Sequence, residues 1–297
     1  MRKLDDVDEE YRKNKELKKE DVQLLKEWIE KQQHLPKISE FQIIIFLHSC
    51  YYRMEPTKIC IETFYTARVH CPEFFKNRNP IEIEPQLFES FAVVPLRKPT
   101  PLGYQIIYVK LINTDPSRVN LGNTYKAFDM VAMLMLHQQG TAPGYIILAD
   151  IAGLVFGHLA RLTPSTIMKF LYYLQEALPF RLKGLIYINI PTFMDKIVAI
   201  LKPIMKKELL EAFQLYTDKL DDLYKTIPLE CLPMDYGGQD DSIDKLIEKT
   251  KENLLANKDF FIEDEKQKAD ESKRVGKSKY AEDVFGIDGT FKKLDID

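Results

Sequence analysis

The side chains able to do chemistry are scattered along this 297-residue chain. The five histidines are His34, His48, His70, His137 and His158, and none stands four residues from another histidine or from a cysteine, where two side chains share a helix face. The four cysteines (Cys50, Cys60, Cys71 and Cys231) form no C-x-x-C pair. Their spacing builds neither a zinc site nor a disulfide framework. We therefore predict no metal site, and thiols that are reduced and mostly buried.

Short motifs of common catalytic and cofactor sites are also missing from the sequence. We find no G-x-S-x-G elbow, no phosphate loop and no G-x-G-x-x-G after a strand. Asp150 ends an apolar run, where open α/β sheets often place functional groups. A carboxylate there also commonly hydrogen-bonds the following loop, and this is the role that we expect. The sequence thus favours binding over catalysis, with no catalytic residue and no cofactor.

The charge balance bears on the partners of the chain. Lys plus Arg total 42 against 45 Asp plus Glu, a net charge of −3. A nucleic-acid binder is usually strongly basic, so we expect no nucleic-acid partner. A hydrophobic fraction of 45% allows a sizeable core and excludes wholesale disorder. The N-terminus has no apolar leader and residues 41–47 are too short to span a bilayer, so we expect a cytoplasmic protein.

The first 76 residues predict a helical subdomain. Asp21 is expected to be the N-cap of a helix that Pro36 closes, and residues 41–50 and 56–70 predict two more helices. Residues 77–101 hold five prolines and predict a connector rather than one continuous element.

Strand and helix patterns then alternate. Residues 105–112, 145–149 and 185–190 are short runs rich in β-branched and aromatic residues, which predict strands. Residues 125–138 and 163–178 predict helices, the second with Thr163 as cap and Pro164 at its first position. This alternation predicts an α/β domain with a mainly parallel sheet and flanking helices over residues 77–238. Residues 239–297 predict a polar C-terminal extension with apolar positions at Phe285, Ile287 and Phe291.

The segment 193–213 predicts one amphipathic helix with a kink at Pro203. At about 100° per residue, one side of this helix is apolar and the opposite side is cationic. The apolar side holds Phe193, Ile197, Ile200, Leu201, Ile204 and Met205, and the cationic side holds Lys196, Lys202, Lys206 and Lys207. Two interpretations remain open. The helix could pack on the sheet with solvated lysines, or it could be a lid over an apolar cavity that can also lie on a membrane. Exposing six large apolar side chains costs on the order of 9–18 kcal/mol, so such a lid stays shut in water.

The stretch 145–238 resembles the lipid-binding domain of the CRAL-TRIO family, particularly its alpha-tocopherol transfer protein-like and clavesin-like members. The matching pieces, in order, are Asp150-Ile-Ala-Gly153, Leu162-Thr-Pro-Ser165, Leu178-Pro-Phe-Arg-Leu-Lys-Gly184, Ile188-Asn-Ile-Pro191, Leu201-Lys-Pro203 and Leu232-Pro-Met-Asp-Tyr-Gly-Gly238. The N-terminal helices fit the N-terminal subdomain of the family more loosely. Residues 270–297 resemble the tail of insect members.

The resemblance implies an apolar cavity closed by a mobile gate helix, and the segment 193–213 matches that gate. Carried over by position, the cavity residues are Thr124, Ala127, Val131, Tyr145, Ala149, Phe170, Tyr173, Leu174, Leu178, Phe180 and Leu185, with Phe193, Ile197, Ile200 and Leu201 on the gate. The implied function is transfer of a hydrophobic small molecule (tocopherol, retinoid, carotenoid or similar lipid) by a monomer that touches membranes transiently. The alternative is a lipid-regulated interaction module in signalling or trafficking.

Some relatives bind phosphoinositides through a basic cluster, which this sequence keeps only in part. Arg181 and Lys183 match two of its members, and Lys202 and Lys206 are further candidates for contact with anionic lipids. Glu208 and Ala212 stand at two positions that are basic in tocopherol carriers, and residues 45–50 replace an arginine-rich pattern. Ala152 replaces the acidic residue usual before Gly153. These departures disfavour phosphoinositide binding.

Overall fold

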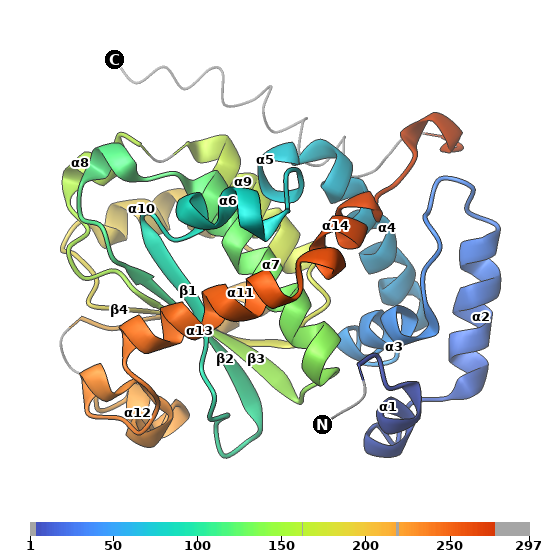
Figure 1. The fold of residues 1–297 in the computed structure, drawn as a ribbon, viewed down its shortest axis with the longest axis horizontal. Helices are drawn as coiled ribbons and strands as arrows, with labels where there is room; N and C mark the ends of the chain where they lie inside the picture. Colours follow the sequence, from blue (N-terminus) through green and yellow to red (C-terminus); the bar gives the residue numbers. More distant parts are fainter. Residues whose placement is uncertain (1–3, 162, 218–219, 277–297) are drawn as a thin grey trace.

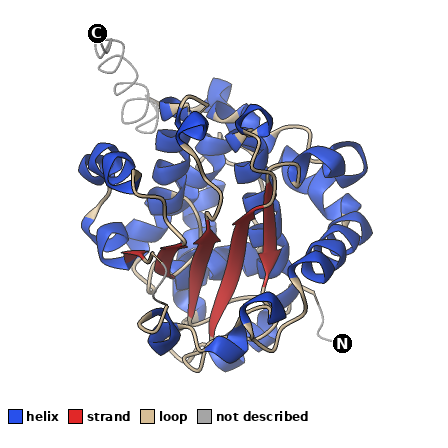
Figure 2. Ribbon diagram, turned by 90° about the vertical axis from the view of Figure 1, so that its left-hand side faces the viewer, coloured by secondary structure: helices blue, strands red, loops and turns tan. Residues whose placement is uncertain are grey.

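A five-stranded sheet lies at the centre of the chain in the computed structural model, which describes residues 4–161, 163–217 and 220–276 (Figure 1). Its spatial order is β1 (Phe91–Pro95), β2 (Tyr104–Leu111), β3 (Gly144–Asp150), β4 (Leu182–Ile188) and β5 (Phe213–Leu215). β1 pairs antiparallel with β2, and the remaining pairs are parallel. Helices cover the sheet on both sides (Figure 2). The predicted α/β class with a mainly parallel sheet is confirmed.

Both faces of the sheet are buried, in two apolar layers. Ile107, Ile147 and Leu185 point into the larger layer, which the N-terminal helices share. Ile106, Ile146 and Ile186 point into the smaller layer on the other face. Successive strand residues alternate between faces, so a strand covered on both sides is apolar throughout.

The three predicted strands form close to their expected bounds, and residues 77–101 form no continuous element, as the sequence predicts, but they include two short ones. That region contains α6 (Pro80–Leu87) and β1. Pro80 is the first residue of the helix, where no backbone N–H is needed, and Pro95 ends an edge strand, which leaves one side of its ladder unpaired. Pro80 and Pro95 therefore mark element ends, whereas Pro85 lies inside α6.

Two long helices flank the sheet on its larger layer. α7 (Leu121–Gln139) begins at Asn120, whose side chain accepts a hydrogen bond from the Asn123 amide, and it ends at Gly140 with φ of 68°. α9 (Pro164–Glu176) has the predicted N-cap Thr163 and Pro164 as its first residue. The short α8 (Phe156–Leu159) precedes α9.

The N-terminal region contains five helices rather than the three predicted: α1 (Val7–Lys13), α2 (Lys19–Glu30), α3 (Glu40–Ser49), α4 (Met54–His70) and α5 (Pro72–Phe75). Asp21 lies in the first turn of α2, whose N-cap is Lys18, and α2 ends at Glu30, before Pro36. An acidic residue in the first turn is also stabilising, so the pattern misplaced the start by a few residues. Ser39 and Gln42 form a capping box at α3.

The predicted continuous helix over 193–213 is wrong. The segment folds as α10 (Met194–Leu201), a 3-10 turn (Lys202–Ile204) and α11 (Lys207–Ala212), and Phe213 begins β5. Pro203 has no N–H to donate to the preceding turn, and Met205 is extended. The chain therefore breaks where the sequence predicted only a kink.

Residues 223–276 add further helices to the same body. α12 (Leu223–Thr226) leads to two 3-10 turns (Leu229–Cys231 and Met234–Tyr236), and α13 (Ile243–Ala256) and α14 (Lys258–Lys266) follow, before a last 3-10 turn (Glu271–Lys273). α13 packs on β1 and α6, and Leu254 and Phe261 are buried in the larger layer. Phe285, Ile287 and Phe291 lie outside the described residues. No helix in the described part of the chain is long and apolar enough to cross a membrane.

Candidate ligand-binding site

The residues predicted to line the cavity gather on one face of the sheet. Most are buried in the larger apolar layer, with Phe170 and Leu201 packed against it: Ala127, Val131, Tyr145, Tyr173, Leu174, Leu178, Phe180 and Leu185. Thr124 and Ala149 are buried as well. These residues come from α7, α9, β3 and β4 and span residues 124–185 of the sequence. The fold thus brings them together at one place.

Two sets of stacked aromatic rings pack within this region. Phe170 stacks on Tyr125 with ring centroids 3.7 Å apart, and Phe128 meets it edge-on at 5.4 Å. Tyr145 stacks on Phe180 at 3.8 Å. Tyr125 and Phe128 are not among the residues predicted from the sequence, although both are next to predicted positions on α7. They are three residues apart, which puts them on one helix face.

Uncharged phenols accompany these rings. Burial raises the pKa of Tyr125 far above its ordinary value and raises the pKa of Tyr187 to about 12. Both hydroxyl groups are therefore neutral at physiological pH. They can offer hydrogen bonds to an apolar ligand without placing a charge beside it.

The apolar residues of α10 divide between the interior and solvent. Leu201 packs on the larger layer, and Phe193 and Ile197 are half-buried. Ile200 is 64% exposed and Phe156 of α8 is 66% exposed. Phe156 meets Phe193 edge-on at 6.0 Å, so α8 and α10 share an apolar surface. We name this surface, formed by Phe156, Phe193 and Ile200, the α8–α10 patch.

Comparison with known proteins bears on this arrangement. A family model described as CRAL/TRIO domain matches residues 91–238, which contain the sheet, α7, α9 and α10. This chain belongs to the CRAL-TRIO family. A model described as Pinta-like, UBA domain matches residues 14–84, which contain the N-terminal helices. The boundaries predicted at 76 and 238 stay predictions.

Similar proteins include alpha-tocopherol transfer protein-like from Homo sapiens, 25% identical over 261 residues, which are 86% of this chain and 75% of the relative. Clavesin-1 from Xenopus laevis is 25% identical over 189 residues, which are 63% of this chain and 56% of the relative. Among solved structures, the crystal structure of Sfh5 has a TM-score of 0.51 and 13% identity, and covers 89% of this chain and 100% of its own. At that identity, the last similarity concerns the fold alone.

Two of the predicted lipid-contacting cations are held by the N-terminal helices. Arg181 donates from Nε to the carbonyl oxygen of His48 at 2.7 Å, and its guanidinium lies 4.4 Å from the Tyr51 ring centroid. Lys183 donates from Nζ to the Tyr51 hydroxyl at 2.8 Å. Both side chains thus connect the CRAL/TRIO domain to the end of α3.

A hollow of about 410 Å³ brings Arg181 together with Lys206. Glu176 and Glu208 line the same hollow, and Lys206 forms an ion pair with Glu176. Lys202 is exposed outside it. Carboxylates therefore offset the cations at the place where a basic cluster would hold an anionic headgroup.

Asp150 has the structural role that the sequence predicted. Its Oδ1 accepts hydrogen bonds from the Ala152 amide at 2.9 Å and from Asn189 Nδ2 at 2.8 Å, and Lys110 Nζ lies 2.6 Å from Oδ2. Tyr236 donates to the same carboxylate. Burial raises the pKa of Asp150, but these hydrogen bonds outweigh burial and hold the pKa below its ordinary value. The charged carboxylate connects β2, β3 and the 232–238 segment.

Gly238, the last residue of that segment, lies so close to neighbouring backbone that only glycine fits at this position. A Cβ atom at this position would lie 1.9 Å from the Leu232 carbonyl oxygen. Within the described ranges, no three His, Cys, Asp or Glu side chains are placed to hold a metal ion.

Proposed function

We propose that this chain binds a hydrophobic small molecule, such as a tocopherol, retinoid or carotenoid, between the sheet and α10, and carries it between membranes as a monomer. Membership of the CRAL-TRIO family, whose members bind and transfer lipids, supports the proposal. The name of the alpha-tocopherol transfer protein-like relative indicates the same class of cargo. Of the fifteen residues carried over from the family, fourteen are the proposed lining, and Ile200, which faces solvent, is assigned to membrane contact instead.

The main observation behind the proposal is that some apolar side chains of α10 pack inside the protein while others face solvent. Leu201 closes the apolar layer from outside, whereas the neighbouring Ile200 and the exposed Phe156 face solvent. A bilayer surface would take up these exposed side chains, and each nearby lysine would gain roughly 1 kcal/mol at an anionic surface. Contact with a membrane would then favour movement of α10 away from the sheet. We propose this movement as the opening of the gate.

The same geometry favours general membrane contact over recognition of a phosphoinositide headgroup. Arg181 and Lys183 are bound to the end of α3, and Lys206 is paired with Glu176. Lys202, two residues after Ile200 in the sequence, remains exposed. We propose that the protein binds and releases its ligand without changing it chemically and without a cofactor.

The first test identifies the cargo. The full chain is purified from its host and extracted with organic solvent, and the extract is analysed by mass spectrometry together with the native mass. A stoichiometric apolar compound on a monomer is expected. A protein that is empty, and that takes up none of a panel of tocopherols, retinoids, carotenoids and phospholipids, would overturn the proposal and favour the interaction module.

The second test separates membrane contact from ligand binding. Ile200→Asp is expected to slow transfer of a fluorescent tocopherol between vesicles and to leave its affinity in solution within about twofold, because the side chain faces solvent. Leu102→Asp is the matched control, since Leu102 is 69% exposed and lies in the turn between β1 and β2. Equal transfer rates for both variants would contradict membrane contact through α10.

A further inference from the structure

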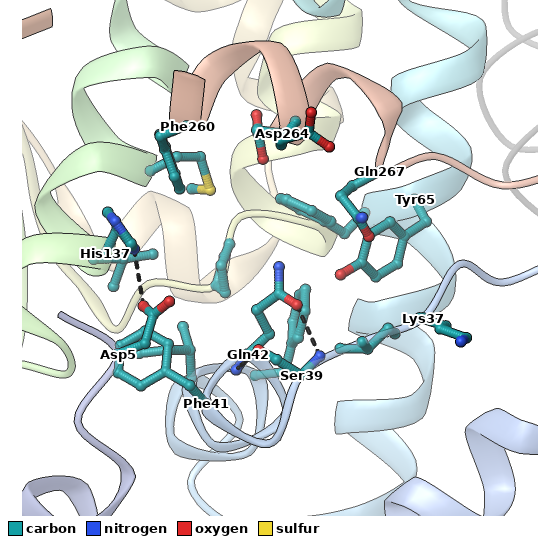
Figure 3. Close-up of a pocket in the computed structure, with 18 residues that line it drawn as sticks. Asp5, Lys37, Ser39, Phe41, Gln42, Tyr65, His137, Phe260, Asp264 and Gln267 are labelled. Carbon is teal, nitrogen blue, oxygen red and sulfur yellow. Dashed lines mark hydrogen bonds and ion pairs between the residues drawn. The ribbon is translucent and has the colours of Figure 1, made fainter. Parts of the chain in front are cut away.

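A second cavity lies away from the CRAL/TRIO lining. It measures about 470 Å³ and lies between α3, α4, the end of α7 and α14 (Figure 3). None of the residues carried over from the family lines it. Its volume is within the range of small-molecule sites, about 300–1,000 Å³.

The wall of this cavity is mainly apolar. Its apolar side chains come from the four helices, from Ile38 just before α3 and from Pro179, and those on the helices are Phe41, Ile45, Phe46, Phe64, Met133, Leu136 and Phe260. Phe46 and Phe64 meet edge-on at 5.2 Å, and Phe260 stacks on His137 at 4.4 Å. Such a wall suits the body of a hydrophobic molecule.

Two buried polar atoms in this wall have no hydrogen-bond partner among the described residues. They are the Tyr65 hydroxyl and Oε1 of Gln267, and the Tyr65 side chain is fully buried. Figure 3 shows both side chains at the same end of the cavity. The Ala269 amide donates to the Tyr65 carbonyl oxygen at 3.0 Å, which holds this part of the chain along α4. Buried polar groups are nearly always satisfied, so these two atoms await a partner.

The charges around the cavity are already balanced. Asp264 pairs with Arg68 at 3.0 Å and with Arg78 at 3.3 Å. Asp5 pairs with His137 at 2.9 Å, and Glu263 pairs with Lys266 at 2.6 Å. Lys37 is exposed at the edge. Among the described residues that line the cavity, no buried charge is left to neutralise an ionised ligand, which favours an uncharged one.

We propose that this cavity is a second ligand site, for an uncharged and largely apolar molecule that carries a hydroxyl group. A single hydroxyl both donates and accepts. It can donate to Oε1 of Gln267 and accept from the Tyr65 hydroxyl, and so satisfy both atoms. A ligand with only a carbonyl group would leave Gln267 Oε1 without a donor. This site is independent of the proposed transfer function.

The test uses the full chain and a photoreactive hexadecanol that carries a diazirine, with the corresponding hexadecanoic acid as the charged comparison. After irradiation, labelled peptides are mapped by mass spectrometry. The alcohol is expected to label peptides of α3 and α14, and the acid is expected to label them much less. Tyr65→Phe should lower this labelling about fivefold through loss of one hydrogen bond. Ile38→Trp, which fills the cavity from its edge, should abolish it.

Tyr52→Phe is the matched control, because it removes a hydroxyl that bonds Asn14 outside the cavity. It should label as the parent chain does. Labelling confined to β3, α9 and α10, or labelling of α3 and α14 that Tyr65→Phe leaves unchanged, would overturn the second site. Labelling of α3 and α14 without β3 and α9 would uphold the second site and weigh against the transfer cavity.

Discussion

Arg78 is fully buried, and it forms a buried electrostatic cluster with Arg68, Asp129 and Asp264. Its Nη1 lies 2.6 Å from Asp129 Oδ2, and Arg68 lies 3.0 Å from Asp264. Tyr173 donates to the other oxygen of Asp129. Two guanidinium groups and two carboxylates thus neutralise each other between α4, α7 and α14. A buried pair of this kind is costly to break because the remaining charge is left in the interior.

Asp129→Asn is therefore expected to lower the free energy of unfolding by about 3–5 kcal/mol. The change keeps the shape of the side chain and removes its charge, which leaves Arg78 facing a neutral group. Chemical denaturation measures the effect. Asp222→Asn, which breaks the exposed pair with Lys225, is the control and should stay within about 1 kcal/mol of the parent chain. Equal losses in the two variants would contradict the role of the buried cluster.

His48 predicts a pH dependence of stability. Burial, followed by the nearby charges of Arg181 and Lys13, lowers the pKa of His48 to about 3. The ordinary pKa of histidine is about 6.5, so below that pH His48 binds a proton in the unfolded chain but stays neutral in the folded chain. This contribution to stability is complete above about pH 6.5 and is lost as the pH falls toward 3. His48→Phe should lose less stability than the parent chain between about pH 7 and pH 4, measured by urea denaturation at each pH. Parallel losses in the two chains would rule out this assignment.

At the scale of elements, Gln175 of α9 holds the break between α10 and α11. Its Oε1 accepts from the Lys206 amide at 2.5 Å, and its Nε2 donates to the Ile204 carbonyl oxygen at 3.4 Å. One side chain thus satisfies backbone groups that Pro203 and the end of the helix leave open. The proposed gate would move about this point.

Gln175→Ala is expected to speed amide hydrogen exchange in residues 194–212 about fivefold, with a small loss of global stability, because one local hydrogen-bonded clamp is removed. Hydrogen exchange with mass spectrometry measures both regions at once. Gln138→Ala is the matched control, since Gln138 clamps Asn253 of α13 at 2.9 Å. It should speed exchange in α13 and leave α10 unchanged. Faster exchange in α10 for both variants would indicate general loosening.

The elements that the sequence predicts well are those whose pattern is set by burial on both faces. β3 and the start of α9 follow from a continuous apolar run and from a Thr-Pro start. β1, β5 and the break after Leu201 could not be predicted, because short edge strands and proline positions depend on what packs beside them. The same limit holds for the site. Periodicity predicts that Phe170 and Leu174 lie on the apolar face of a helix. Only the fold shows that Tyr125 stacks on Phe170 and that Ile200 faces solvent.

At the scale of the molecule, residues 257–274 complete the core of the N-terminal helices. Phe261 is fully buried, and the Arg78 guanidinium lies 6.0 Å from its ring centroid. Glu265 accepts from the amides of Asn77 and Arg78 at 3.1 and 2.9 Å. Arg274 pairs with Glu62 of α4 at 2.9 Å. The polar composition of this region hides a few apolar and charged residues that join it to α4 and to the segment before α6.

Phe261→Ala should therefore destabilise the N-terminal helices as well as α14, by about 3–5 kcal/mol. The single tryptophan, Trp28 on α2, reports on the N-terminal helices, and far-ultraviolet circular dichroism reports on the whole chain. The two denaturation curves should shift together and stay coincident, as in one cooperative unit. Phe156→Ala removes the same side chain from an exposed position and should change stability by less than about 0.5 kcal/mol. If the Trp28 curve stays in place while the circular dichroism curve shifts, the N-terminal helices unfold separately, and α14 is not the element that joins them to the sheet.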